Sequence, residues 1–223
     1  MALPFSETDL RRLIVRACRS LVDKGLVAAY DGNISARLPS GNMLVTPARV
    51  SKAEVTEESI LYCSPEGRRI RGSGLVSTEV LLHVAAYRGR KEVRGVVHAH
   101  PPTACAFTFA GVEALLAEPV LPEVVARLGA IPAVPYETPG TQELADLAAP
   151  FFARHDAVLL NQHGAVTLGA DPWNAYLLME KVEHAAVVLK AARELAGSDA
   201  GVKRLTAQQV ADLLKSYKYG KKH

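Results

Sequence analysis

The sequence predicts a mixed α+β domain built on a mainly antiparallel central sheet. Segments with helical apolar spacing open and close the chain, and short apolar or alternating segments separated by turn residues lie between them. A hydrophobic fraction of 49% over 223 residues is enough for one sizeable core. No repeat or linker marks a second domain, so we expect one domain over residues 1–223, with residues 203–223 forming a C-terminal helix and tail.

The first half of the chain predicts a helix followed by a strand meander. Ser6 and Asp9 form a capping-box pattern ahead of apolar residues at helical spacing, and Gly25 ends this helix. Helical spacing returns over residues 77–88, and residues 95–100 predict a buried strand that ends in polar residues. Short strands separated by Ser-Gly and Pro-Glu-Gly turns are expected over residues 33–38, 43–46, 60–63 and 68–72.

The second half alternates helices with one strand pair. Residues 157–160 and 166–168 are expected to pair as strands across Gly164. The Thr206-x-x-Gln209 pattern predicts the cap of a final helix. Three further helices, two of them with proline in the first turn, are expected over residues 101–110, 142–152 and 172–195.

Composition excludes several classes of partner. The 26 basic and 23 acidic residues give a net charge of +3, which is too small and too dispersed for a nucleic-acid surface. The N-terminus resembles neither a secretory signal nor a membrane span, so we expect a cytoplasmic protein without a membrane partner. The three cysteines, Cys18, Cys63 and Cys105, have no CxxC pair and are expected to be reduced, buried thiols.

Three histidines and one glutamate form a candidate metal site. His98 and His100 lie on the same side of a predicted strand, with Cα atoms roughly 6–7 Å apart. His163 follows the strand over residues 157–160, and Glu79 adds an oxygen donor near a helix start. This set suits Zn²⁺ and tolerates Mn²⁺, Co²⁺ or Fe²⁺, and the absence of thiolate favours a catalytic site.

The same residue types also occur in proteins without a metal. Buried histidines often bond only a carbonyl group, and a glutamate at a helix start often serves only as a cap. A cupin barrel also combines HxH with a glutamate, but residues 103–105 are Thr-Ala-Cys and the long helices contradict an all-β barrel. The remaining histidines are expected on a helix face, in a loop or in the tail, at His83, His155, His184 and His223.

Six motifs occur in a fixed order along nearly the whole chain. They are Asp31-Gly-Asn-Ile-Ser-Ala-Arg37, Leu44-Val-Thr-Pro47, Ser77-Thr-Glu79 before His83 and Tyr87, Val96-Val-His-Ala-His100, Tyr136-x-Thr-Pro-Gly-Thr141 and Asn161-Gln-His-Gly164. Together they resemble the class II aldolase/adducin family. The resemblance implies a three-layer α/β/α fold, a ring-shaped homotetramer and an active site between adjacent subunits.

The resemblance also implies roles for the four candidate ligands. His98, His100 and His163 resemble the three zinc histidines, and Glu79 resembles the carboxylate that binds the metal at rest and acts as the base. A metal held by neutral imidazoles would stabilise the enediolate left by C–C cleavage. A carboxylate beside it can move a proton at the nucleophilic carbon.

Two further catalytic candidates come from the resemblance alone. Fuculose-type members carry a Tyr before a Gly in a tail that reaches a neighbouring site, and Tyr219 before Gly220 is similar; Tyr217 is a rival, and a solvated tail is the alternative. Epimerase and dehydratase members carry an acid midway between the HxH and the third histidine. Glu123 falls there, with Glu118 as the neighbouring alternative, whereas fuculose-type members have a Tyr near that position.

The substrate anchor departs from the family pattern. The family holds phosphate with a Gly-Asn turn, a Thr-Pro-Ser/Thr-Gly loop and paired serines. The chain replaces the hydroxyl residue and the glycine of the loop with Ala48 and Arg49, and Tyr30 narrows the same corner. Arg49 either clamps a phosphate or carboxylate or faces solvent. The expected substrate-binding residues are Gly32, Asn33, Thr46, Arg49, Ser77 and Thr78.

The resulting expectation is a zinc-dependent aldehyde-lyase of carbohydrate metabolism. It would reversibly cleave a small ketose 1-phosphate, such as L-fuculose 1-phosphate, or a related hydroxy-keto compound into dihydroxyacetone phosphate or its analogue and a short aldehyde. The alternatives on the same scaffold are a sugar-phosphate 4-epimerase, a methylthioribulose-1-phosphate dehydratase and a hydroxy-acid decarboxylase. A non-catalytic adducin-like structural domain is the distant alternative, because all four candidate ligands are present.

Overall fold

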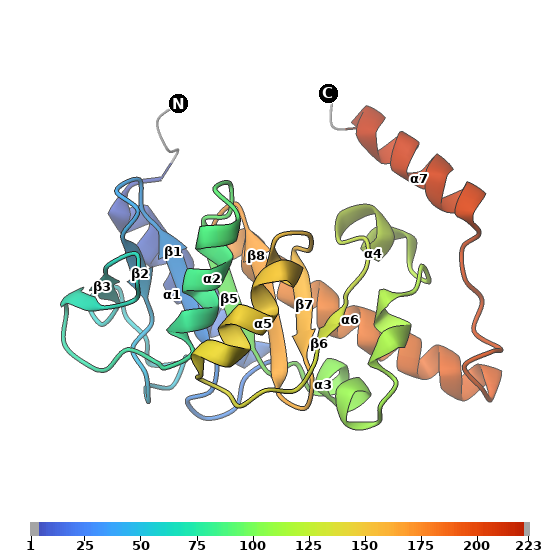
Figure 1. Ribbon diagram of the computed structural model, residues 1–223, viewed down its shortest axis with the longest axis horizontal. Coiled ribbons are helices and arrows are strands. Elements are labelled where there is room, and N and C mark those ends of the chain that lie inside the picture. Colours follow the sequence, from blue (N-terminus) through green and yellow to red (C-terminus); the bar gives the residue numbers. More distant parts are fainter. Residues whose placement is uncertain (1–4, 221–223) are drawn as a thin grey trace.

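Figure 1 shows the computed structural model, which describes the backbone of residues 5–220 and side chains as far as residue 217. The described strands form one sheet with the order β4-β3-β2-β1-β5-β8-β7-β6. Every neighbouring pair is antiparallel except β6 with β7. The strands are β1 (Asn33–Arg37), β2 (Met43–Val45), β3 (Leu61–Cys63), β4 (Arg69–Arg71), β5 (Gly95–Ala99), β6 (Ala133–Val134), β7 (Ala157–Leu160) and β8 (Gly164–Gly169).

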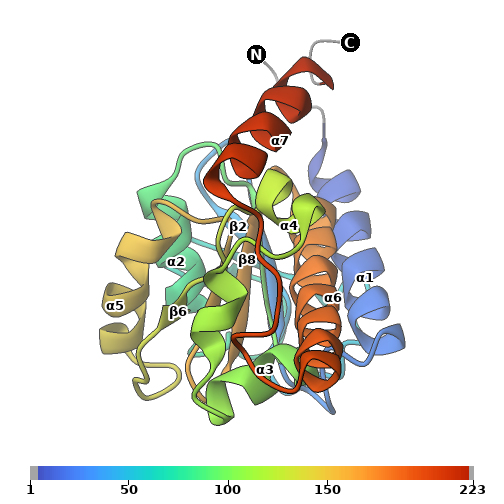
Figure 2. The same ribbon diagram turned by 90° about the vertical axis from the view of Figure 1, so that its right-hand side faces the viewer.

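Helices cover both faces of this sheet. Figure 2 shows α1 and α6 on one face and α2 and α5 on the other, which confirms the expected three-layer α/β/α fold. The helices are α1 (Glu7–Asp23), α2 (Val80–Gly89), α3 (Pro102–Phe109), the 3₁₀ helix η1 (Glu113–Ala117), α4 (Pro122–Arg127), α5 (Gln142–Phe152), α6 (Pro172–Ala196) and α7 (Ala207–Gly220).

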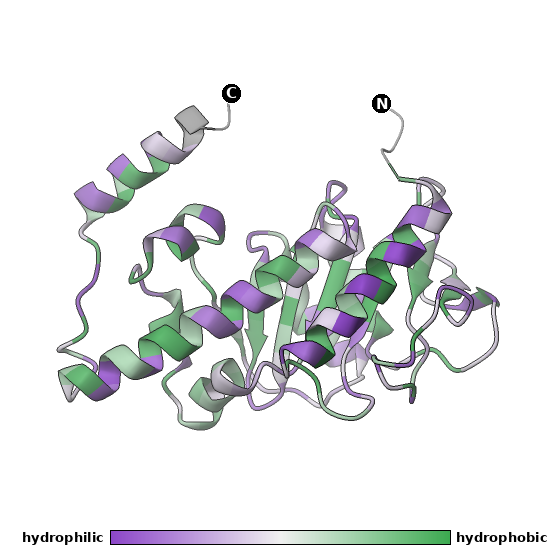
Figure 3. Ribbon diagram, turned by 180° about the vertical axis from the view of Figure 1, so that it is seen from behind, coloured by the Kyte–Doolittle hydropathy of each residue, from purple (hydrophilic) through white to green (hydrophobic). Residues whose placement is uncertain are grey.

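The central strands are buried on both faces, and their side chains divide between two apolar cores. Val97 and Leu159 belong to the core beneath α1 and α6, whereas Val96 and Val158 belong to the core beneath α2 and α5. Successive side chains of a strand point to opposite faces, so each strand serves both cores. Figure 3 shows mixed hydrophilic and hydrophobic residues on α1 and α6 and mostly hydrophobic strands behind them. None of the described helices combines the length and apolarity needed to span a bilayer.

Most helices and strands lie where the sequence predicts them, and side-chain caps mark the start of several helices. Ser6 and Asp9 form the capping box of α1, and Thr206 and Gln209 exchange the equivalent bonds before α7. Three elements were not predicted: η1, α4 and β6. They span five, six and two residues, and such short segments contain too few residues to show a hydrophobic period.

Candidate metal centre

The sheet register brings the candidate ligands to one end of three strands. His98 on β5 pairs with Asn33 at the start of β1, and Ala99 pairs with Ala165 near the start of β8. His163 stands in the tight turn between β7 and β8, where its N–H donates to the Leu160 carbonyl. Strand pairing therefore gathers histidines that lie more than sixty positions apart in the sequence.

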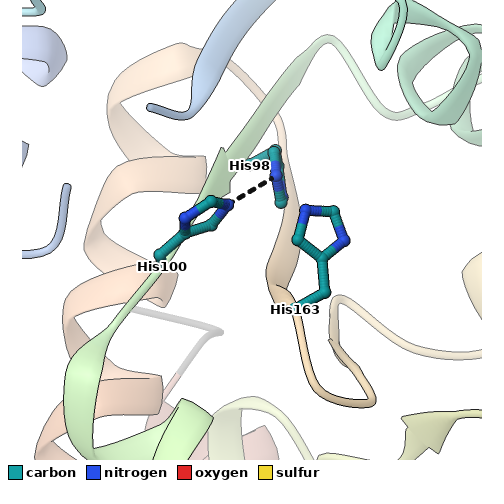
Figure 4. A group of neighbouring side chains, drawn as sticks. All are labelled: His98, His100 and His163. Atoms are coloured by element: carbon teal, nitrogen blue, oxygen red, sulfur yellow. Dashed lines mark hydrogen bonds between the residues drawn. The ribbon is translucent and has the colours of Figure 1, made fainter. Parts of the chain in front are cut away.

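Figure 4 shows the three imidazole rings pointing toward one another. The ring centres of His98, His100 and His163 lie 4.8 to 5.1 Å apart, and one ligand atom from each lies within 4.8 Å of the others. The Nε2 atoms of His98 and His100 approach to 3.2 Å. Nδ1–H of the fully buried His98 donates to the Ala165 carbonyl at 3.0 Å, which leaves its Nε2 lone pair directed into the cluster.

Glu79 completes the donor set from the position just before α2. Its Oε1 lies 3.3 Å from Nε2 of His98 and 3.0 Å from Nε2 of His163. Its Oε2 accepts a hydrogen bond from Nδ2 of Asn33 at 3.2 Å, and its backbone N–H donates to the Ser77 hydroxyl. The Glu79 carboxylate is therefore held at one oxygen while the other faces the histidines.

Electrostatics keep Glu79 and His100 in the protonation states that a cation requires, whereas the Glu79 carboxylate outweighs burial and raises the pKa of His98. Burial favours neutral Glu79, but attraction to His98 and contact with His163 outweigh it and hold the pKa of the Glu79 carboxyl well below its ordinary value. Burial, followed by repulsion from His98 and His163, lowers the pKa of His100 to about 4. Near neutral pH the site thus offers an ionised carboxylate and a neutral His100 imidazole.

The residues fit a divalent metal. Among the described buried side-chain atoms without a hydrogen-bond partner is Glu79 Oε1, which lies between His98 and His163, and such an atom is costly unless another group satisfies it. Asp31 Oδ2 lies 3.6 Å from Nδ1 of His100, on the side away from His98, where a carboxylate orients a ligating histidine. Three imidazoles and one carboxylate form a typical zinc donor set.

A pocket of about 190 Å³ opens onto this cluster. Gly32 at its wall has φ of +73°, and a Cβ there would lie 2.7 Å from the His98 carbonyl oxygen, so only glycine fits. The expected anchors Gly32, Asn33, Arg49 and Ser77 all line this pocket. Its lining residues are Tyr30, Asp31, Gly32, Asn33, Pro47, Ala48, Arg49, Ser77, Glu79 and His100.

Two expected anchors lie elsewhere. Thr46 is fully buried, and its hydroxyl accepts a hydrogen bond from the Ile34 N–H at 3.1 Å, so it supports β1 rather than the pocket wall. Thr78 is exposed and lies against Gly140, where an added Cβ would be 2.4 Å from its hydroxyl oxygen. Neither residue lines the pocket.

A buried lysine that sequence analysis missed joins the two loops of the pocket. The Lys52 ammonium donates to the carbonyls of Tyr30 and Val50 at 3.1 and 3.0 Å, and the residue is only 1% exposed. Burial lowers the pKa of this amine. Arg49 directly precedes Val50 in the second of these loops. It is exposed and has φ of +59°, a conformation that favours glycine. A single buried lysine has no spacing signal in the sequence.

Two other residues near the site make contacts that the sequence did not predict. His83, expected on a helix face, is fully buried, and its Nε2 lies 2.5 Å from Oδ1 of Asn33. Glu183 on α6 accepts hydrogen bonds from the N–H groups of Thr103 and Ala104, all at 3.0 Å. Since α3 begins with prolines and has no side-chain cap of its own, Glu183 fixes the helix that follows His100.

Of the two catalytic candidates outside the motifs, Glu123 does not line this pocket. It is exposed on α4, which lies above α3 in Figures 1 and 2. The Tyr219 side chain lies outside the described residues, and its rival Tyr217 is exposed on α7. Glu118 forms an ion pair with Arg204 before α7. The three cysteines are free and buried, as expected.

Comparison with known proteins identifies the family. Residues 12–189 match the class II aldolase and adducin N-terminal domain. The chain belongs to the class II aldolase/adducin family. The crystal structure of YgbL from Klebsiella pneumoniae, at 29% identity, superposes with a TM-score of 0.83 and covers 94% of this chain and 99% of that one.

Two curated relatives of the family have different reactions in their names. The chain is 31% identical to the 3-oxo-tetronate 4-phosphate decarboxylase of Escherichia coli K12 over 93% of its own length and 96% of that protein. It is also 31% identical to the L-fuculose phosphate aldolase of the same strain, over 78% of its own length and 79% of the aldolase. Both names describe lyases.

Proposed function

We propose that the protein is a metal-dependent lyase that breaks a C–C bond beside a carbonyl group in a small phosphorylated substrate. The observation that carries this proposal is the convergence of three histidines and Glu79 at the mouth of a pocket with Asn33, Ser77 and Arg49 in its wall. The donor set suits a metal, and the pocket wall offers an amide, a hydroxyl and a guanidinium to an anion.

The metal ligands in this proposal are His98, His100, His163 and Glu79, with Zn²⁺ as the first candidate and Mn²⁺, Co²⁺ or Fe²⁺ as alternatives. A metal bound there supplies a Lewis acid for the negative charge that develops on the substrate carbonyl oxygen. Glu79 is the proposed proton carrier, because one of its oxygens accepts no hydrogen bond and lies among the histidines. Its carboxylate would take a proton from solvent and pass it to the substrate carbon. Asn33 keeps the other oxygen in place.

Decarboxylation of a 3-oxo acid phosphate is the first candidate reaction. The chain matches the decarboxylase over 93% of its length but the aldolase over only 78%. In 3-oxo-tetronate 4-phosphate the bond between the carboxylate carbon and C2 breaks, its electron pair stays on C2 beside the carbonyl, and CO₂ leaves. Protonation of C2 then gives dihydroxyacetone phosphate.

Aldol cleavage of a ketose 1-phosphate, such as L-fuculose 1-phosphate, is the second candidate. It leaves the electron pair on the same kind of carbon, releases an aldehyde in place of CO₂, and gives dihydroxyacetone phosphate after the same protonation. The residues at the pocket therefore serve both reactions, and the leaving fragment distinguishes them. Epimerase and dehydratase chemistry is a further alternative, which requires Glu123 to reach the pocket of a neighbouring subunit because it does not line its own.

We also propose that the chain is one domain over residues 1–223 and assembles as a homotetramer with sites between adjacent subunits. Two features support this assembly. Figures 1 and 2 show α7 projecting away from the layers, and in our proposal this helix carries Tyr219 to the site of a neighbouring subunit. Glu123 does not line the pocket of its own subunit.

The test is product analysis on metal-loaded protein. We expect 3-oxo-tetronate 4-phosphate to yield CO₂ and dihydroxyacetone phosphate, and a strong chelator to stop both. Release of dihydroxyacetone phosphate with an aldehyde from L-fuculose 1-phosphate, without CO₂ from the oxo acid, would select aldol cleavage. The Glu79→Gln variant should be strongly impaired on either substrate, and His184→Ala, at an exposed helix position, is the matched control. Absence of both reactions in zinc-loaded protein would contradict the proposal.

A further inference from the structure

A chain of five hydrogen-bonded side chains lies behind the candidate metal centre. Tyr87 and Ser35 are joined at 2.7 Å, Ser35 and Nδ1 of His83 at 2.6 Å, and Nε2 of His83 and Oδ1 of Asn33 at 2.5 Å. Nδ2 of Asn33 then donates to Glu79. The first four residues are buried, and His83 and Ser35 have no exposed surface. The arrangement connects β1 and α2 to the only charged group of the series.

The Glu79 carboxylate fixes the direction of every bond in this series. Nδ2 of Asn33 donates to Oε2 of Glu79, so the carbonyl oxygen of the Asn33 amide faces His83. Nε2 of His83 must then donate, so its Nδ1 accepts from the Ser35 hydroxyl. The Ser35 oxygen in turn accepts from the Tyr87 hydroxyl.

We propose that His83 is a positioning residue that locks the Asn33 amide with its carbonyl inward and its NH₂ toward Glu79 and the pocket. The part of this inference that concerns anions rests on the proposed function. An NH₂ group at the pocket wall attracts a phosphate or carboxylate, whereas a rotated amide would present its oxygen to Glu79 and to the substrate anion. His83 thus determines whether Asn33 is a donor or a repulsive acceptor.

The surroundings of His83 support this role. Asn33 is only 3% exposed, so water does not easily replace a lost donor at its carbonyl. Burial lowers the pKa of His83 to about 3, with a further contribution from His98, so the ring is neutral and has one N–H. One N–H and one lone pair match the two partners, Asn33 and Ser35.

The direct test reads the tautomer of His83 without any substrate. In ¹⁵N-histidine-labelled protein, long-range ¹H–¹⁵N correlation spectra should show His83 with the proton on Nε2, and Tyr87→Phe should leave that tautomer unchanged. Ser35→Ala removes the only donor to Nδ1 and should weaken the preference. A proton on Nδ1 in the wild-type protein would overturn the proposal, whatever reaction the enzyme catalyses.

A pair of substitutions tests the consequence for anions. In His83→Gln the side-chain amide is long enough to place an N–H at the position of the His83 Nε2 atom, which bonds Asn33. In His83→Asn the shorter side chain reaches only the position of Nδ1, which bonds Ser35. We expect His83→Asn to weaken binding of inorganic phosphate by about tenfold, as for a lost hydrogen bond to a charged group, and His83→Gln by less than about threefold.

Circular dichroism and thermal midpoints show whether both variants are folded. If both folded variants lose phosphate affinity equally, or if neither loses any, His83 does not control anion binding in the pocket through Asn33. If the wild-type protein fails to bind phosphate, the proposed anion site is wrong, and the tautomer alone decides the role of His83.

Discussion

The histidine end of the sheet and the C-terminal segment over residues 197–217 are held in opposite ways. At the histidine end, buried side chains from β1, α2, β5 and the β7–β8 turn contact one another, and the chain supplies a partner for most polar groups. The C-terminal segment meets the body through the Arg204–Glu118 ion pair, a Leu205 N–H to Pro119 carbonyl bond of 2.8 Å and the buried Val202. The first region is fixed by buried contacts within the chain, whereas the second has fewer such contacts and in our proposal also meets a neighbouring subunit.

The largest expected effect comes from His98→Ala, which breaks the histidine end and leaves the tail untouched. Because His98 contributes one of three converging nitrogens and contacts Glu79, we expect loss of zinc retention after dialysis and a fall in turnover of at least about a thousandfold. Metal content by mass spectrometry and product release measure the two effects. His184→Ala, exposed on α6, should change neither. Full activity of a zinc-free His98→Ala protein would refute the metal centre.

Glu79→Gln should give the next largest effect and separates proton transfer from metal retention. The amide keeps the size of the side chain but cannot carry the proton, so we expect kcat to fall by about 10²–10⁴. The three histidines remain, so zinc should be retained more firmly than in His98→Ala. Parallel measurement of kcat and bound zinc checks this order. A Glu79→Gln enzyme with wild-type kcat would remove Glu79 from the chemistry.

The histidine end was predictable because metal chemistry restricts residue types. The HxH spacing on a strand and the motif around Glu79 indicated which side chains gather, and the register between β5 and β8 explains why His163 joins them. The partners behind them were not predictable. Lys52 and His83 each contact a residue over twenty positions away, and although one motif includes His83, no spacing signal in the sequence indicates the partners of either side chain.

The fold shows the same contrast. Helices of eight or more residues and the longer strands had readable periods, and their caps were visible at Ser6 and Thr206. The short α4 and β6 depend on pairing and packing with distant segments, as when β6 adds to β7 in parallel. The sites of Glu123 and Tyr219 depend in our proposal on a second subunit, and no feature of one chain specifies that geometry.

The lowered pKa of His83 predicts how the free energy of unfolding depends on pH. His83 has an ordinary pKa of 6.5 and a folded pKa of about 3, so its contribution to stability is complete above 6.5 and is lost as the pH falls toward 3. We expect this residue alone to reduce the free energy of unfolding by about 2 kcal/mol between pH 7 and pH 5, since one pKa unit corresponds to about 1.4 kcal/mol. Urea unfolding of the wild type and His83→Gln should differ by this amount in pH dependence. An identical dependence would show that His83 is not held neutral.

The smallest expected effect is that of Arg204→Ala, which breaks the tail contact and spares the histidine end. The Arg204 side chain is about one third exposed, so its ion pair with Glu118 contributes about 0.2–1 kcal/mol, and the thermal midpoint should hardly move. Arg204 also donates to the carbonyls of Asp199 and Val202, so its loss should release the connection to α7. Amide exchange in α7 should accelerate while β5 and β8 stay protected.

Lys215→Ala is the matched control for Arg204→Ala, because its pair with Asp212 lies within α7 and is largely exposed. Its amide exchange should match the wild type. Unchanged exchange in Arg204→Ala would contradict this prediction and would mean that other contacts hold α7, either its packing against α4 of the same chain or a neighbouring subunit. If the neighbouring subunit holds α7, dilution to monomer should restore the effect of Arg204→Ala.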